Sequence, residues 1–235
     1  MRQVGPATPS SRPDLVMPDN CSDVIARLDA ETDRIDVIAV GAMSVPLLLR
    51  ERSPGRYVGL RFRPGHGRRA LRVDAGDLRD QCVPLEDFDP VLRRLIEGAI
   101  RSAMSARDTA LALQRVVAPR LTRETGPAAA VQDALGRIAA ARGALPMERL
   151  CRELHVTRQH LARLFERDVG VAPKVVARVA RVRHVMTLAG RQPAWARIAA
   201  EAGYADQSHL IADFRTLVGA TPAAWLARRQ VPNLL

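Results

Sequence analysis

The sequence predicts an α+β protein: a small N-terminal β-rich domain, a helical connector, and an all-α C-terminal domain of two helix-turn-helix units joined by a linking helix. Two observations predict this order. Short β-prone runs separated by Gly and Pro fill residues 15–74, and apolar residues at helical spacing follow from residue 85. In the last third of the chain one motif recurs after 49 residues, the period of a small supersecondary unit.

The N-terminal part is expected to hold a leader and a small sheet. Residues 1–14 are rich in Pro and Ser and are predicted to be disordered. Residues 15–85 are predicted to form a β-rich, sensor-like domain, because short runs of β-branched and aliphatic residues alternate there with turn residues. Strands are expected at residues 35–40, 45–49, 56–62 and 71–73.

Residues 86–125 are predicted to form a helical connector of two antiparallel helices. One apolar stripe runs over residues 91–100 and another over residues 111–121. Pro119 predicts an early end or a kink in the second helix, because proline lacks the amide hydrogen that a helix needs. The pair would serve as a connector or as the face of a homodimer, and the sequence does not choose between these roles.

The repeat defines the two helix-turn-helix units. One set of residues recurs in the same register: His160-Leu161, Phe165, Val169-Gly170 and Pro173, then His209-Leu210, Phe214, Val218-Gly219 and Pro222. Each copy opens with a residue that caps helices well, Thr157 or Asp206, and closes with a Gly that favours a left-handed helix end. A linking helix is expected from Pro173 to about Gly190, and its residues 174–189 would span roughly 24 Å at 1.5 Å per residue.

The distribution of charge indicates a partner that carries phosphates. Of the formal net charge of +11, residues 127–235 carry +8, with 16 basic and 8 acidic residues, and residues 1–126 carry +3. The basic excess coincides with the duplicated unit, which is the electrostatic pattern of a nucleic-acid-binding domain. Solubility through net charge is the alternative explanation.

No catalytic or metal-binding cluster stands out in the sequence. It holds no nucleophile–base pair, Gly-rich phosphate loop or set of Cys and His at metal-ligand spacing, so we expect no enzyme, cofactor or metal site. His66 is interpreted as a turn residue. Cys21, Cys82 and Cys151 are interpreted as small buried residues with free thiols in a reducing compartment. Without a secretory signal or membrane span, the protein is expected in the cytoplasm.

The second copy of the repeat resembles the DNA-binding domain of the AraC/XylS family of bacterial transcriptional regulators. The matching residues are Ile198-Ala199, Gly203-Tyr204, Asp206-Gln207-Ser208-His209, Phe214-Arg215, Gly219 and Thr221-Pro222. The first copy matches more loosely, through Leu150, Leu154, Thr157, His160-Leu161, Arg163, Leu164-Phe165, Gly170 and Pro173. The resemblance implies that residues 127–230 form an AraC-type DNA-binding domain and that the protein regulates transcription.

The N-terminal half resembles, more weakly, an uncharacterised domain that is often found ahead of such modules. The similarity rests on residues 59–65 and 83–87, which read GLRFRPG and VPLED. This copy lacks the aromatic-rich segment expected before Met17-Pro18-Asp19. Either the start of the chain is misassigned or the sheet is incomplete, and an incomplete sheet would leave no intact ligand pocket.

The resemblance also implies which residues contact DNA, because the second helix of a helix-turn-helix unit enters the major groove. The base-contacting positions of the family match Gln159, Ala162 and Arg163 in the first unit, and Gln207, Ser208, His209, Ile211 and Ala212 in the second. Arg163 suits a guanine edge and Gln207 an adenine edge, whereas Arg158 and Arg215 are expected to contact phosphates. Ala162 and Ala212 replace long polar residues, which predicts sparse readout.

The expected partners follow from the same resemblance. The linking helix would hold the two second helices about one DNA turn, near 34 Å, apart, so that one chain reads two adjacent major grooves of double-stranded promoter or operator DNA. RNA polymerase, an unidentified small-molecule effector and a second copy of the chain are further candidate partners, and no membrane contact is expected. The alternative is an effector- or protein-binding interaction module with weak or lost specific DNA binding. A repair–regulator fusion of the Ada type would need a zinc-type cysteine cluster, which the N-terminal half lacks.

Overall fold

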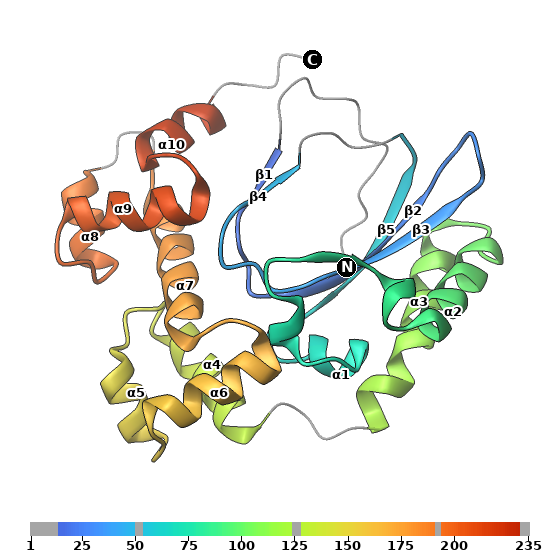
Figure 1. The fold of residues 1–235 in the computed structure, drawn as a ribbon. Coiled ribbons are helices and arrows are strands. Elements are labelled where there is room, and N and C mark those ends of the chain that lie inside the picture. The colour runs from blue at the N-terminus through green and yellow to red at the C-terminus, as the bar shows by residue number, and fades with distance from the viewer. Residues whose placement is uncertain (1–13, 50–53, 124–127, 191–193, 231–235) are drawn as a thin grey trace.

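The structure, a computed structural model, describes residues 14–49, 54–123, 128–190 and 194–230. Within these residues a β-rich N-terminal part is followed by an all-helical C-terminal part (Figure 1). The predicted α+β fold class is therefore confirmed. The predicted leader, except for Asp14, lies outside the described residues, as does the predicted domain boundary at residues 125–127.

The main sheet is antiparallel, with its strands in the order β5-β2-β3-β6. These strands are β2 (Ser22–Leu28), β3 (Ile35–Val40), β5 (Arg56–Phe62) and β6 (Cys82–Pro84). A separate antiparallel pair joins β1 (Asp14–Val16) to β4 (Leu47–Leu49). Strands β3 and β5 have the predicted bounds. Strand β2 was not predicted: its buried residues are small and alternate with Asp and Arg, and pairing with both neighbours places it inside the sheet.

The predicted strand at residues 71–73 is wrong. Helix α1 (Gly67–Leu71) takes up the first of these residues, and Arg72 ends it in the left-handed conformation, at φ 57°. Leu71 is buried in the core beside the sheet, so tertiary packing set the conformation of a run too short to show a period of its own. Two short 3-10 turns, η1 (Ala75–Leu78) and η2 (Leu85–Asp87), flank β6.

Two longer helices form the core of the N-terminal part together with the sheet. They are α2 (Pro90–Arg101) and α3 (Ala106–Arg123), and they lie side by side at the edge of the molecule (Figure 1). Leu92 and Ile96 of α2 are buried in one cluster with Leu113 of α3 and apolar residues of β2 and β3. Val91 and Leu95, also in the predicted stripe, are 53% and 49% exposed, so this part of the stripe faces away from the core.

Helix α3 continues past Pro119 to Arg123, so of the two predicted alternatives, an early end or a kink, the early end is wrong. Arg120 holds the last turn, because its buried guanidinium is ion-paired with Asp89 and donates to the carbonyl of Ala70 at 3.3 Å. Asp89 also caps α2 by accepting a hydrogen bond from the amide of Leu92 at 2.9 Å. One carboxylate thus ties the start of α2 to the end of α3.

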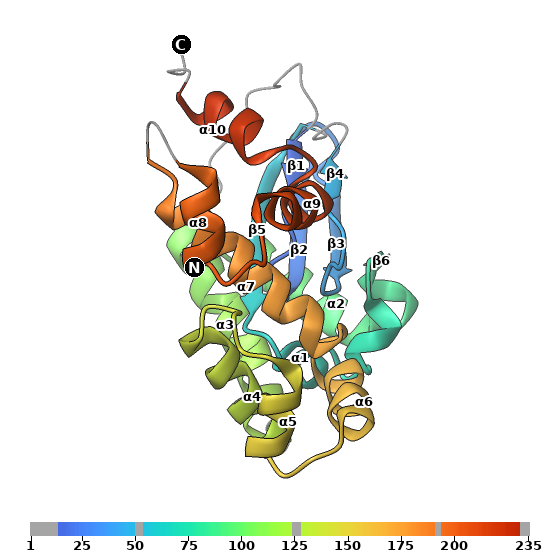
Figure 2. The ribbon, with the colours of Figure 1, turned by 90° about the vertical axis from the view of Figure 1, so that its left-hand side faces the viewer.

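The C-terminal part holds two separate apolar cores that share one helix. Its helices are α4 (Ala129–Ala140), α5 (Met147–Glu153), α6 (Arg158–Val169), α7 (Pro173–Leu188), α8 (Trp195–Glu201), α9 (Gln207–Val218) and α10 (Pro222–Gln230). Val176 of α7 belongs to the core of the first unit, whereas Val179, Val182 and Val185 belong to that of the second. Figures 1 and 2 show α7 running from one unit to the other. The linking helix is therefore confirmed, and none of the described helices has the length and apolar character to cross a bilayer.

The three cysteines are free, but they differ in exposure. Cys151 is buried as predicted and Cys21 is half-buried, whereas Cys82 is exposed, which corrects the sequence interpretation. Burial raises the pKa of the Cys21 thiol to about 12, and the Asp19 carboxylate adds to this effect. Desolvation by neighbouring atoms also raises the pKa of the Cys82 thiol, although this residue is exposed to solvent.

We expect iodoacetamide at pH 8 to modify Cys82 in the native protein before the other two cysteines. Cys21 forms its reactive thiolate only as the pH approaches its raised pKa, and Cys151 is covered by the first core. Mass spectrometry of peptides sampled over time measures the order. Modification of Cys21 first would contradict the environment described for that thiol.

Candidate nucleic-acid interface

Helices α6 and α9, the second helices of the two units, begin with equivalent caps. The hydroxyl of Thr157 accepts a hydrogen bond from the amide of His160 at 3.1 Å, and the carboxylate of Asp206 accepts one from the amide of His209 at 2.7 Å. A glycine in the left-handed conformation ends both helices. The predicted caps are therefore confirmed, and the sequence repeat forms a structural repeat.

The N-terminal half of α6 presents its predicted DNA-contacting residues to solvent. These residues, all exposed, are Arg158, Gln159, Ala162 and Arg163. Arg158 is ion-paired with Glu148 of α5, so a phosphate would have to compete with that carboxylate. Arg163 makes no ion pair within the part of the chain that the structure describes, which leaves its guanidinium available to a partner.

The equivalent face of α9 is exposed at all predicted positions except one. The exposed residues are Gln207, Ser208, His209, Ala212 and Arg215. Ile211 is only partly exposed, because it packs against the core of the second unit. The ring of His209 meets that of Tyr204 edge-on, with centroids 5.2 Å apart. Among the predicted DNA-contacting residues of this helix, Gln207, Ser208 and Arg215 are exposed polar side chains without such an aromatic contact.

Two arginines of the linking helix position the second unit. Arg178 donates from Nε to a carboxylate oxygen of Asp213 on α9 at 2.8 Å. Arg181 lies over the ring of Tyr204, 4.7 Å from its centroid, and donates to the carbonyl of Gly203 at 3.3 Å. Because Gly203 and Tyr204 form the turn before α9, these contacts fix that helix relative to α7. From the sequence, Arg178 and Arg181 were interpreted only as charged residues of the linking helix, without these contacts.

The C-terminal half of α6 packs against the N-terminal part of the protein. Helix α1 and turn η1 both contact α6, and Arg79 at the end of η1 pairs with Glu166 at 2.8 Å (Figure 2). Asp168 is buried; although burial opposes it, Arg167 and the amide of Ala128 hold the pKa of this carboxyl below its usual range. The N-terminal half of α6, with its predicted DNA-contacting residues, therefore stays exposed. The C-terminal half of the same helix packs against the N-terminal part of the protein.

The described residues hold no cluster of three His, Cys, Asp or Glu side chains suited to a metal ion. His66 follows Gly65 in the turn before α1, as predicted from the sequence, and it also lines a cleft between the two parts of the protein. The cleft could not be predicted from the sequence, because its walls come from segments far apart in the chain.

Residues 150–228 match the family model described as a helix-turn-helix domain. This segment holds the second half of α5, all of α6 to α9, most of α10, and every residue predicted to contact DNA. The C-terminal domain is an AraC-type helix-turn-helix domain. Residues 3–84 match a domain of unknown function (DUF6597), in agreement with the resemblance of the N-terminal half to an uncharacterised domain. No curated relative matches the chain.

Solved structures of ToxT from Vibrio cholerae are similar to this chain over most of its length. ToxT from strain O395 is 12% identical, with a TM-score of 0.45 over 95% of this chain and 96% of that one. ToxT bound to (E)-4-(8-methylnaphthalen-1-yl)but-3-enoic acid is 14% identical, with a TM-score of 0.48 over 93% and 96%. Wild-type ToxT bound to an unsaturated fatty acid is 14% identical, with a TM-score of 0.42 over 93% and 92%.

Proposed function

We propose that the protein is a sequence-specific, DNA-binding transcriptional regulator whose AraC-type domain reads two adjacent major grooves with α6 and α9. The observation that carries the proposal is the structural repeat: two helices with equivalent caps keep exposed N-terminal halves and are joined by one linking helix. The 16 residues of α7 span about 24 Å at 1.5 Å per residue. A helix of that length suits two reading helices about one DNA turn apart.

The rest of the chain would modulate this activity. We propose residues 127–230 as the DNA-binding domain and residues 15–85 as the sensor-like domain for a small-molecule effector. Residues 86–125 would link them. Exposed Val91 and Leu95 on α2 support this segment as the face of a homodimer. RNA polymerase as a partner and a cytoplasmic location follow from the family resemblance, and the proposed role requires no catalytic residue.

Replacing Arg163 by alanine is expected to cost about 1–3 kcal/mol of specific DNA affinity and to relax the preference at one base pair. Its exposed guanidinium, on the reading face of α6, is suited to a bidentate contact with guanine. Selection of bound duplexes from a random pool, followed by titration of selected and random duplexes, measures both effects.

The control for charge is Arg94→Ala, which removes an exposed arginine from α2 in the N-terminal part. Equal loss of affinity for selected and random duplexes would identify Arg163 as a phosphate contact. Failure of the wild-type protein to enrich any duplex would overturn the proposed function in favour of an interaction module without specific DNA binding.

A further inference from the structure

The two helix-turn-helix units touch each other directly, besides sharing α7. The turn between α4 and α5, residues 141–146, runs beside α7 and reaches the turn between α8 and α9 (Figures 1 and 2). A Cβ atom placed on Gly203 would lie 2.9 Å from the Cβ of Ala144, closer than two carbon atoms pack. The backbone at Gly203 is therefore in contact with the Ala144 side chain, with no room for a methyl group between them.

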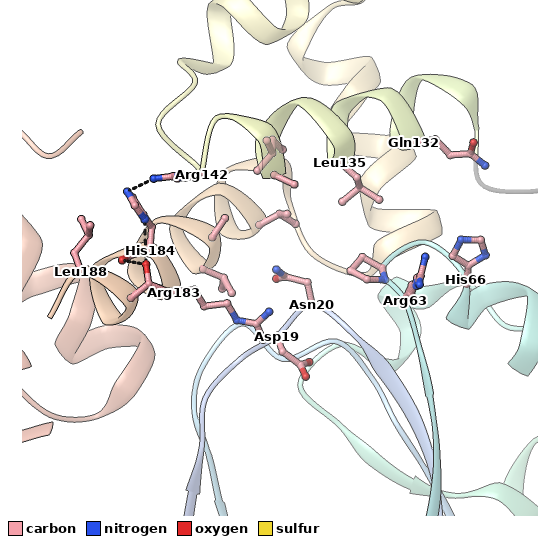
Figure 3. A pocket seen from close by; sticks show the side chains of 17 residues that line it. Asp19, Asn20, Arg63, His66, Gln132, Leu135, Arg142, Arg183, His184 and Leu188 are labelled. Carbon is pink, nitrogen blue, oxygen red and sulfur yellow. Dashed lines mark hydrogen bonds between the residues drawn. The ribbon is translucent and has the colours of Figure 1, made fainter. Parts of the chain in front are cut away.

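The turn of the first unit is fixed on α7. Arg142 and Gly143 both have left-handed backbones, at φ 51° and 80°. A Cβ on Gly143 would lie 2.1 Å from the carbonyl oxygen of Ala177 and 2.7 Å from the amide nitrogen of Arg181, so this close approach needs a glycine. The guanidinium of Arg142 also contacts the ring of His184 at 3.3 Å (Figure 3). Because the neighbours of Gly143 are backbone atoms of a helix, the turn cannot move closer to α7.

The turn of the second unit is fixed on the same part of α7. Arg181 donates to the carbonyl of Gly203 at 3.3 Å and lies over the ring of Tyr204. The amide of this arginine lies beside Gly143, whereas its side chain holds the turn of the second unit. Both turns thus meet at one residue of α7. We call this set of residues the inter-unit joint: Gly143, Ala144, Arg181, Gly203 and Tyr204.

The inter-unit joint lies close to the start of α9. This helix begins at Gln207, three residues after Tyr204, and its exposed N-terminal half carries residues predicted to contact DNA. A displacement of the second turn would therefore tilt that half of α9 relative to α6. Neighbouring base pairs differ by about 3.4 Å along the duplex and about 35° around it. Because binding residues must be held to within about 0.5 Å and 10–20°, a small tilt is enough to disturb the contacts of α9 with the bases.

We infer that the contact between Ala144 and Gly203 sets the angle between α6 and α9, and thereby the spacing of the two half-sites that one chain reads. The inference rests on the proposed function. Helix α7 fixes how far apart the units lie, whereas the inter-unit joint fixes how they are turned about that helix. Ala144 and Gly203 are positioning residues, which act through the orientation of α9.

The test uses the full-length protein and three duplexes. The first carries both half-sites at the spacing that selection from a random pool enriches, and the second has one base pair inserted between them. The third keeps only the half-site of α6. Gly203→Ala is expected to lower affinity for the first duplex about tenfold or more and to leave affinity for the third unchanged, because α6 still reads its half-site. The preference for the first duplex over the second should weaken as well.

A double variant separates the contact from backbone strain. Gly203 has φ 75°, so Gly203→Ala also strains a left-handed residue. Adding Ala144→Gly removes the opposing Cβ and keeps this strain, so the double variant should recover the wild-type spacing preference. Gly219→Ala is the control for strain in the same unit, because it has φ 71° and its Cβ would meet Leu15 instead of the joint. This control should keep the wild-type spacing preference.

A second variant keeps the test open if Gly203→Ala does not fold, which circular dichroism shows. Ala144→Val adds bulk to the same contact from the first unit, where the backbone is not left-handed. It should produce the same loss of spacing preference. Equal spacing preferences of Gly203→Ala and the double variant, or a wild-type preference in both Gly203→Ala and Ala144→Val, would overturn the inference.

Urea denaturation of the same variants measures the contact without DNA. Ala144→Gly and Gly203→Ala should destabilise the protein less together than the sum of their separate effects, and additive effects would overturn the inference. If the wild-type protein enriches no duplex, the proposed function fails, whereas the denaturation measurement still decides whether the contact exists. If the wild-type protein binds the first duplex and the variants keep its spacing preference, only the inference fails.

Discussion

Replacing Phe214 by alanine is expected to destabilise the second helix-turn-helix unit by about 3–5 kcal/mol, the usual cost of truncating a buried phenylalanine. Phe214 lies on α9 and is fully buried in the core of the second unit. Its ring packs edge-on against that of Trp225, with ring centroids 5.6 Å apart. The core of the first unit is a separate cluster and does not include this residue. The variant should therefore lose the DNA contacts of α9 before those of α6.

Hydroxyl-radical footprinting on a selected duplex measures this outcome. The wild-type protein should protect two patches about one helical turn apart, and Phe214→Ala should protect one. Phe165→Ala is the matched variant, because Phe165 occupies the same place in the repeat and is fully buried in the first core. Phe165→Ala should remove the patch that α6 protects and leave the patch that α9 protects. Loss of both patches in either variant would show that the units fold as one through α7.

Replacing Gly170 by alanine is expected to loosen the contact between the N-terminal part and α6. Gly170 has φ 88°, so a side chain there costs about 1–2 kcal/mol through strain in the left-handed conformation. Its Cβ would also lie 2.6 Å from the carbonyl oxygen of Ala75, a backbone atom of η1. Overpacking of this kind costs about 1–3 kcal/mol, and separation of the two domains is the simplest way to relieve it.

The repeat provides the matched control for this prediction. Gly219 ends α9 as Gly170 ends α6, with φ 71°, but its Cβ would meet only the end of the exposed Leu15 side chain, which can turn away. Gly219→Ala should therefore show the conformational strain alone. Urea denaturation measures the difference in stability, and limited trypsin digestion at Arg79, the partner of Glu166, measures separation. Equal stability and equal digestion of the two variants would show that the contact does not persist in solution.

Features whose causes are local could be predicted from the sequence alone. A capping side chain accepts a hydrogen bond from the backbone amide three residues later, and a glycine ends a helix in the left-handed conformation. Both effects act within one or two turns of the helix. The bounds of both reading helices, their exposed N-terminal faces and the linking helix could therefore be predicted from the repeat. Strands β3 and β5 were predictable for the same reason, because runs of apolar residues between turns mark them.

Features that depend on residues far apart in the chain could be seen only in the folded protein. Strand β2 lies inside the sheet because it pairs with a neighbour on each side. Residues 67–71 form a helix that buries Leu71 in the core. Helix α3 continues past Pro119 because the ion pair between Arg120 and Asp89 stabilises its last turn. The cleft and the contact between the N-terminal part and α6 likewise bring together segments that lie far apart in the sequence. Burial and long-range pairing outweigh the small local preferences of such segments, and a single sequence does not reveal which distant partners will meet.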